Sequence, residues 1–543
     1  MTRTDRHRSR TRLLVAGTTA AVVGVTAGAA GVASAAAALP PLSFVAASTN
    51  VVAERYVSGE DVYFYLDLGV NIIPGKDPFE IRAKRTSYKN PIVAKQIVVK
   101  NGKKTAVALP AGMVTDFGGF KNFTAITITD TKGAKVKSYQ TDFCPNSYNS
   151  ARTRRDAPAL NPYPQGCSAY NPFVLGDVWG IQAGWNSTTE SMPRWDRFEQ
   201  PDFDLPAGTY KVTVALNKKY RDHFKIPVAK ATLKLNLTVN EIIEEEKPGA
   251  VAARKAAQAR AVQAGVVPPA TGHGLHDGEG DANRQLSAYL PEFRAPARRP
   301  AAMAAAAVPK GPRPDLRSLP AWGISLGRGE DPKTGVDDGR RYINFGATVW
   351  NGGTSPLLVD GFRRTGTELM DAYQYFFDAA GKEVGSVKAG TMEWDKRAGH
   401  MHWHFTDFAQ YRLLKADKKV AVRSGKESFC LANTDAVDYT LKNAKWRPRN
   451  TDLSTSCGGN TAVAVREVLD VGSGDTYDQS RPGQSFDVTD LPNGTYYIEV
   501  LANPKKKLAE TSTTNNSALR KVVLSGTKTA RKLTVPPVYG IQG

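Results

Sequence analysis

The sequence predicts an all-β protein with two β-sandwich-like domains. Short runs of alternating apolar and polar residues, bounded by turn residues, recur on both sides of a middle stretch that lacks this pattern. Hydrophobic residues make up 41% of the 543 residues and charged residues 23%, which is enough to build ordinary cores. At about 150 residues per domain, the length allows two to four units. We therefore expect two sandwiches joined by a linker.

Residues 1–35 are predicted to be a signal peptide. Five arginines lie between Arg3 and Arg12, and a small-residue apolar run follows from Leu13 to about Val32. Ala33-Ser34-Ala35 then has the Ala-x-Ala form of a cleavage site. A membrane anchor is the alternative, but the run is rich in Gly, Ala and Thr and only weakly apolar. Because no later apolar run is long enough to span a bilayer, we expect a secreted protein without a stable membrane span.

Residues 40–240 are predicted to form the first sandwich. Its β-rich or alternating segments are 62–68, 91–99, 123–130, 209–214 and 231–239. The last of these alternates almost perfectly, as a strand does when one face meets the core and the other meets water. No motif in this domain indicates its role.

Residues 241–312 are predicted to be a flexible linker. Ala, Arg, Pro and Glu dominate the stretch, and a helix over 251–266 would have an apolar face made mostly of Ala, so no third core is expected. His273 and His276 are interpreted as solvated side chains of this linker rather than as metal ligands.

Residues 313–530 are predicted to form the second sandwich. Strands are expected at 342–350, 373–378, 384–387, 495–501 and 519–524. A short likeness links the two halves, because Leu-Pro-Ala-Gly-Thr-Tyr at 205–210 is echoed by Leu-Pro-Asn-Gly-Thr-Tyr at 491–496. We expect both to form the same sandwich corner.

The formal net charge is +20, but part of it lies in the first dozen residues and in the Arg-rich linker. No nucleic-acid motif accompanies the charge, so a nucleic-acid partner is not expected. The four cysteines fall into two local pairs, and one disulfide in each domain is the economical pairing in an exported protein. Free thiols or a thiolate metal site are the alternatives, although neither pair has the close spacing of a zinc site. The pairs are Cys144 with Cys167 and Cys430 with Cys457.

The strongest chemical signal is a histidine cluster. Of the seven histidines, His400, His402 and His404 lie within five residues, flanked by aromatic residues. Alternate side chains of an extended segment share a face, so the three imidazoles can point one way. The outer two would lie roughly 13 Å apart in an ideal strand, so binding one ion requires a bend, which Gly399 could supply. Imidazoles suit copper, zinc, iron or nickel, so the cluster predicts a metal site and not a reaction.

Several segments around and after this cluster resemble lysyl oxidases, in the order found in that family. The resemblance covers roughly 314–524 and is carried by Val349-Trp-Asn-Gly-Gly-Thr-Ser355, Gly399-His-Met-His-Trp-His-Phe-Thr-Asp-Phe-Ala-Gln-Tyr-Arg-Leu-Leu414, Gly425-Lys426-Glu-Ser-Phe-Cys430-Leu, Gly474-Asp-Thr-Tyr477, Gly483-Gln-Ser-Phe-Asp-Val-Thr-Asp490, Asn503-Pro504, Leu508, Glu510 and Asn515-Asn516.

The resemblance implies a copper-dependent amine oxidase. The three histidines would hold Cu(II), and Tyr477 would be oxidised to a quinone to which the ε-amine of Lys426 adds, giving a lysine tyrosylquinone. This cofactor would oxidise primary amines, with protein lysines among the candidate substrates, to aldehydes with O2, releasing hydrogen peroxide and ammonia. A free lysine amine is a nucleophile, and a phenol beside a redox metal is readily oxidised.

Departures from the family limit the prediction. Gln410 stands where animal members have a histidine considered for proton transfer, and Asp407 and Asp475 are only weak candidates for a base. One cysteine pair remains where animal enzymes have several. A secreted copper-binding structural protein without turnover is therefore the alternative. A metal-dependent hydrolase would instead use zinc and would not need Lys426 or Tyr477. The sequence does not indicate the oligomeric state.

Overall fold

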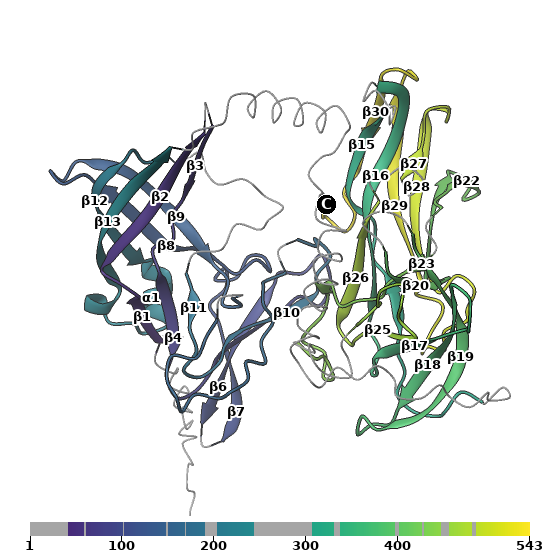
Figure 1. Cartoon of the computed structure of the whole chain (residues 1–543), viewed down its shortest axis with the longest axis horizontal. Coiled ribbons are helices and arrows are strands. Elements are labelled where there is room, and N and C mark those ends of the chain that lie inside the picture. Colours follow the sequence, from purple (N-terminus) through teal and green to yellow (C-terminus); the bar gives the residue numbers. More distant parts are fainter. Residues whose placement is uncertain are drawn as a thin grey trace, which may run out of the picture. The chain divides into compact units, whose positions relative to one another are not determined.

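The computed structural model describes most of the chain between residues 42 and 542. Strands dominate these residues, together with the short helix α1 (Lys218–His223) and the 3-10 turn η1 (Val228–Lys230), so the all-β prediction is confirmed (Figure 1). The predicted signal peptide and most of the predicted linker lie outside the described residues. The described ranges are 42–58, 61–100, 102–147, 150–168, 170–189, 204–243, 307–330, 337–396, 401–425, 428–446, 455–479 and 485–542.

The described strands between residues 42 and 243 form three sheets. All pairings are antiparallel except that of β2 with β13, which are parallel. In sheet order the strands are β1 (Leu42–Ala46), β4 (Val70–Pro74) and β11 (Ser187–Thr188); β10 (Gly176–Ile181), β5 (Phe79–Lys84), β6 (Val93–Lys100) and β7 (Lys103–Ala108); and β3 (Asp61–Tyr65), β2 (Asn50–Ser58), β13 (Thr232–Ile243), β12 (Gly208–Leu216), β8 (Phe120–Thr129) and β9 (Lys135–Phe143).

Aromatic side chains fill the core between these sheets. Phe120 is fully buried and its ring contacts the rings of Phe123, Trp179 and Phe224 at centroid distances of 5.9, 5.6 and 5.7 Å. Such contacts add packing energy beyond the area that the rings bury. Each predicted strand of this half overlaps an observed strand, although β3 ends at Tyr65 where the prediction extended to residue 68.

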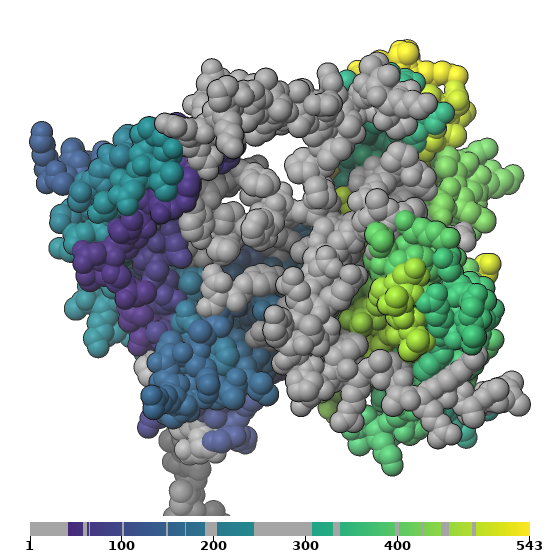
Figure 2. Space-filling model, viewed as in Figure 1, coloured from purple at the N-terminus to yellow at the C-terminus, as the bar shows by residue number. Residues whose placement is uncertain are grey.

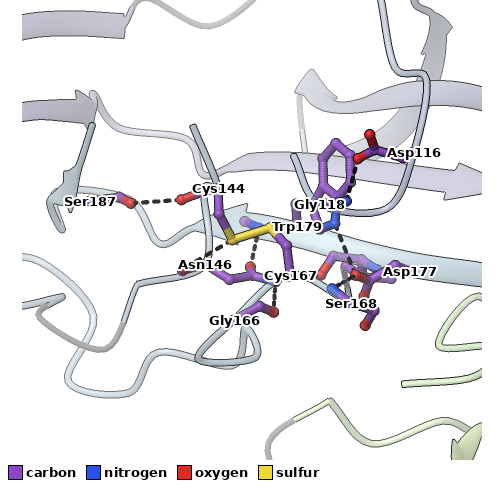
Figure 3. Close-up of a disulfide and its surroundings, with 12 residues drawn as sticks. Asp116, Gly118, Cys144, Asn146, Gly166, Cys167, Ser168, Asp177, Trp179 and Ser187 are labelled. Carbon is purple, nitrogen blue, oxygen red and sulfur yellow. Dashed lines mark hydrogen bonds between the residues drawn. A yellow bond between two sulfur atoms is a disulfide. The ribbon is translucent and has the colours of Figure 1, made fainter. Parts of the chain in front are cut away.

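The disulfide of this half joins Cys144 to Cys167, which is the local pairing expected from the sequence. Figure 3 shows it next to β10, where Asn146 donates to the Gly166 carbonyl. The neighbouring carboxylate of Asp177 is fully buried and accepts hydrogen bonds from the Ser168 N–H and the Trp179 indole. Burial raises the pKa of Asp177 to about 6 despite these bonds.

The described strands between residues 307 and 542 also form three sheets. They are β14 (Leu316–Ser318), β16 (Asp337–Asn351), β26 (Ser473–Asp478) and β24 (Asp435–Ala436), with β15 (Trp322–Glu330) and β27 (Phe486–Asp487) also paired to β16; β23 (Ser428–Phe429), β20 (Trp403–Thr406), β19 (Glu383–Trp394), β18 (Leu369–Phe377), β17 (Leu357–Arg363) and β25 (Ala464–Leu469); and β22 (Val420–Arg423), β21 (Ala409–Lys415), β28 (Gly494–Ala502), β29 (Ser517–Gly526) and β30 (Arg531–Thr534).

One apolar core lies between these sheets and includes Phe345, Phe405 and Ile498, one from each sheet, all fully buried. The hairpin of β21 and β22 lies at the edge of its sheet. The side chains of β22 are exposed or half-buried, and the hairpin protrudes from the surface of this half, where Figure 2 shows it in green. The chain passes directly from β22 to the segment that contains Lys426.

The two repeated corner sequences form the same structure. The hydroxyl of Tyr210 donates to the Pro206 carbonyl at 2.8 Å, and that of Tyr496 donates to the Pro492 carbonyl at 2.7 Å. Each tyrosine thus bonds to the backbone four residues before it, as in the tyrosine corner of sandwich folds. The interpretation of the echo as a shared corner is confirmed.

Backbone and side-chain bonds also join residues of the two halves. The N–H groups of Leu175 and Gly176 donate to the Val437 carbonyl, at 2.7 and 3.1 Å. The buried amide of Asn171 donates to the Thr348 hydroxyl at 3.0 Å. The segment that contains Val437 leads from β24, which pairs with β26.

Candidate metal and cofactor site

Two of the three predicted histidine ligands lie side by side. His404 is in β20 and His402 just precedes it, with their Nε2 atoms 2.9 Å apart. The strand begins only at Trp403, because Met401 has a left-handed backbone with φ of 42°. The extended run therefore ends before it reaches His400, in keeping with the bend that a three-histidine site requires. His400 itself lies outside the described residues.

A carboxylate supports the buried imidazole of His404. Asp395 follows β19, and its N–H donates to the His402 carbonyl at 3.1 Å. Its Oδ2 lies 3.3 Å from His404 Nδ1, and the two side chains are 7% and 1% exposed. A carboxylate beside Nδ1 favours the tautomer that leaves the Nε2 lone pair available. Both imidazoles can then present Nε2 to the same point.

This arrangement fits a metal ion. Two nitrogens bound to one metal at about 2.0 Å are about 2.8 Å apart when the angle between the bonds is 90°, as for adjacent ligands of square-planar Cu(II). The observed separation of 2.9 Å is close to this value, and it is also the length of a hydrogen bond between the two imidazoles. Among the described residues, however, no group of three or more His, Cys, Asp or Glu side chains converges to hold a metal ion. The described pair could supply two ligands, and a third would have to come from outside these residues.

Tyr477 lies in β26 and is 3% exposed. Its hydroxyl donates to the Cys430 carbonyl at 2.7 Å, and its ring meets that of Phe429 edge-on at 4.8 Å. Burial raises the pKa of Tyr477 well above its usual value, and the nearby acids Asp475 and Glu467 raise it further. The phenol is therefore held neutral and turned toward the segment that follows Lys426.

Lys426 lies outside the described residues, but the described residues on either side of it are anchored by bonds. Before it, the Ser424 N–H donates to the Tyr411 carbonyl at 3.0 Å. After it, β23 pairs with β20, and Cys430 is joined to Cys457 by a disulfide. Cys430, whose carbonyl accepts the hydrogen bond from Tyr477, is only four residues after Lys426 in the chain. The Cys430–Cys457 pairing was expected from the sequence.

The described geometry does not bring the imidazole pair and the phenol together. Alternation along β20 places His404 on the opposite face from Phe405. Phe405 is the register partner of Phe429, against which Tyr477 packs. The histidines and Tyr477 thus lie on opposite sides of the β20–β23 ladder.

Two buried acids lie near Tyr477. From the sequence, Asp475 was only a weak candidate for a base and Glu467 was not predicted. Asp475 shares a strand face with Tyr477 and is 1% exposed. Glu467 in β25 is fully buried, and burial raises its pKa well above the usual value. In the sequence Glu467 follows Arg466 in a short alternating run, a pattern equally typical of a surface strand, so nothing there marked it.

The other two positions discussed for proton transfer differ in their surroundings. Gln410 lies in β21 and is 6% exposed. Asp407 pairs with Lys505 at 3.7 Å and with Lys507 at 2.9 Å. Asp407 is therefore held by cations of the 505–507 segment, whereas Asp475 is the candidate that lies beside Tyr477.

Together, the fold and the site define an all-β region of three sheets that carries a histidine pair suited to a metal and a buried tyrosine held next to a disulfide. Residues 372–532 match the model of the lysyl oxidase family, a range that includes all five predicted metal and cofactor residues. This part of the chain is therefore a lysyl oxidase-family domain.

Individual relatives support the same assignment. The chain is 30% identical over 131 residues to lysyl oxidase homolog 3B of Danio rerio, covering 24% of this chain and 14% of the relative. It is 32% identical over 125 residues to the protein-lysine 6-oxidase of Homo sapiens, covering 23% of this chain and 26% of the relative. Human lysyl oxidase homolog 1 is 32% identical over 126 residues, which are 23% of this chain and 19% of the relative. The similarity thus spans about a quarter or less of each curated relative.

Proposed function

We propose that the C-terminal half of the chain is a copper-dependent amine oxidase. It would convert a primary amine, O2 and water into an aldehyde, ammonia and hydrogen peroxide. The observation that carries the proposal is the Nε2 pair of His402 and His404, 2.9 Å apart, within a lysyl oxidase-family domain. The name of the human relative, protein-lysine 6-oxidase, makes the ε-amine of a protein lysine the first substrate to test.

In this proposal His400, His402 and His404 hold the metal. Copper, when bound, supplies the redox chemistry that uses O2 to oxidise the ring of Tyr477. Asp395 holds the imidazole of His404 in the orientation that leaves Nε2 available. Lys426 supplies the amine that joins the oxidised ring, giving the lysine tyrosylquinone that reacts with substrate.

The bonds of Tyr477 support its part in the proposal. Its hydroxyl is bonded to Cys430, so the chain that carries Lys426 is anchored beside the ring. At 3% exposure, however, the ring cannot meet an amine from solution unless the neighbouring segment moves. Asp475, on the same strand face as the ring, is the carboxylate we propose to accept the proton removed from the bound substrate.

We also propose that the protein is secreted, with residues 1–35 removed as a signal peptide and 241–312 serving as a linker between two domains. Two disulfides are consistent with export to an oxidising compartment. No helix in the described part of the chain is long and apolar enough to cross a membrane.

One observation favours a second candidate, a secreted copper-binding protein without turnover. The described geometry separates Tyr477 from the histidine pair and buries its ring. Peroxide release by copper-loaded protein, measured against a panel that includes a lysine-containing peptide, a diamine and a monoamine, separates the two candidates. We expect release that is lost in Lys426→Ala and Tyr477→Phe but kept in Lys415→Ala, which changes an exposed lysine of β21. Copper binding with no release from any amine would favour the structural role.

A further inference from the structure

Glu467 is a buried carboxyl group in β25, at one edge of its sheet. Its side chain is fully buried. Burying a carboxyl group is unfavourable unless hydrogen bonds replace those that it made to water. The groups that bond to Glu467 therefore indicate why a polar residue occupies a core position.

Two backbone N–H groups from the predicted site converge on this carboxyl group. The N–H of Leu431 donates to Oε2 at 3.0 Å. The backbone N–H of Phe405 also lies beside the carboxyl group and lowers its pKa. Phe405 adjoins His404, and Leu431 adjoins Cys430, whose carbonyl accepts the hydroxyl of Tyr477. One side chain thus contacts residues next to both parts of the site.

The position of Glu467 across the sheet explains how it reaches both. β23 and β25 are the two edges of one six-stranded sheet, with β20 next to β23. The 455–457 segment lies between these edges, since the Thr455 hydroxyl donates to the Leu431 carbonyl and accepts from the Val468 N–H. The side chain of Glu467 also reaches across these edges, because it accepts the bond from the Leu431 N–H.

Burial raises the pKa of Glu467 well above its usual value, with the charge of Asp475 adding to the effect. Burial therefore favours the neutral acid, and Oε2 accepts the bond from the Leu431 N–H. The other oxygen, Oε1, has no hydrogen-bond partner among the described residues. A glutamine amide has the same size and also offers one accepting oxygen.

We propose that Glu467 is a positioning residue that holds the histidine strand β20 and the Cys430–Leu431 segment in register with each other. It thereby sets where the His404 imidazole and the Tyr477 hydroxyl lie on the two sides of the β20–β23 ladder. The proposal rests on the proposed function for its catalytic meaning, but the bonds themselves can be tested without copper.

The test compares Glu467→Gln with Glu467→Leu in the full chain. Gln374→Leu is the matched control, because Gln374 is fully buried in β18 of the same sheet and exchanges two 2.8 Å bonds with Ala509, away from the site. Amide hydrogen exchange of peptides containing Phe405 and Leu431 is measured in metal-free protein. Cu(II) affinity is measured by competition with a chelator, and the melting temperature is recorded for each variant.

We expect Glu467→Leu to expose the Phe405 and Leu431 amides to exchange and to weaken Cu(II) binding at least tenfold, as for changes around metal ligands. Glu467→Gln should restore the amide protection and the copper affinity. Gln374→Leu should lower the melting temperature without changing the exchange of the two amides or the copper affinity. Equal loss of copper affinity in Glu467→Leu and Gln374→Leu would overturn the proposal, as would unchanged exchange at the two amides. If wild-type protein binds no copper, the proposed function fails while the exchange result still decides the role of Glu467.

Discussion

Replacing Asp395 with asparagine should weaken copper binding without disturbing the fold. The change keeps the size of the side chain and removes its charge. Oδ2 of Asp395 lies 3.3 Å from Nδ1 of His404, and both side chains are buried, so solvent does not screen the interaction. The carboxylate favours the imidazole tautomer with the proton on Nδ1, and an amide does so less strongly.

The expected loss of copper affinity follows from this geometry. Outer carboxylates that orient metal-binding histidines typically contribute about 10- to 100-fold in metal affinity, which is about 1.4–2.8 kcal/mol. Titration of Cu(II) against a chelator of known affinity measures the change. Asp407→Asn serves as the control, because Asp407 pairs with Lys505 and Lys507 and not with an imidazole. We expect the control to bind copper as the wild-type protein does.

Equal affinities for Asp395→Asn and the wild-type protein would refute the role assigned to Asp395. A loss far greater than 100-fold would instead show that Asp395 is itself a ligand. In either case the melting temperature of the metal-free variant must stay close to that of the wild-type protein for the comparison to hold.

Two further predictions concern stability. Tyr210→Phe and Tyr496→Phe should each remove one corner hydrogen bond and lower the free energy of unfolding by about 1 kcal/mol. The melting temperature should then fall by about 2–4 °C in calorimetry, and no shift in either variant would argue against the shared corner. Burial raises the pKa of Asp177 to about 6, from an ordinary value of about 4, so the folded form binds more protons than the unfolded form between these values. Stability should therefore fall by up to about 3 kcal/mol as pH rises from about 4 to 6, and Asp177→Asn should flatten this slope in melting temperatures measured from pH 4 to 7; parallel slopes would contradict the burial argument.

The strands were predictable because their periodicity is local. The run at 231–239 alternates as β13 does, and the corner sequences form two equivalent tyrosine corners. The disulfides were predictable for a similar reason, since each pair is close in sequence. The histidine cluster likewise indicated that the imidazoles point in one direction, and the Nε2 atoms of His402 and His404 do lie side by side.

The surroundings of these residues were not predictable, because they depend on register between distant strands. Asp395 reaches His404 only because Trp394 is opposite Trp403 in the β19–β20 pair. Glu467 reaches Leu431 across the gap between two sheet edges. The order of the motifs also gave no sign that Tyr477 would pack on the other side of β20 from the histidines.

We propose that Lys426 and Tyr477 become one cofactor when copper and O2 are present. Mass spectrometry of digested protein, after incubation with copper in air, tests this most directly. We predict a joined peptide pair containing both residues, together with colour and reactivity toward a carbonyl reagent, and we expect all three to be absent in Lys426→Ala and in metal-free protein. A copper-loaded protein that stays colourless and yields only separate Lys426 and Tyr477 peptides would contradict the account.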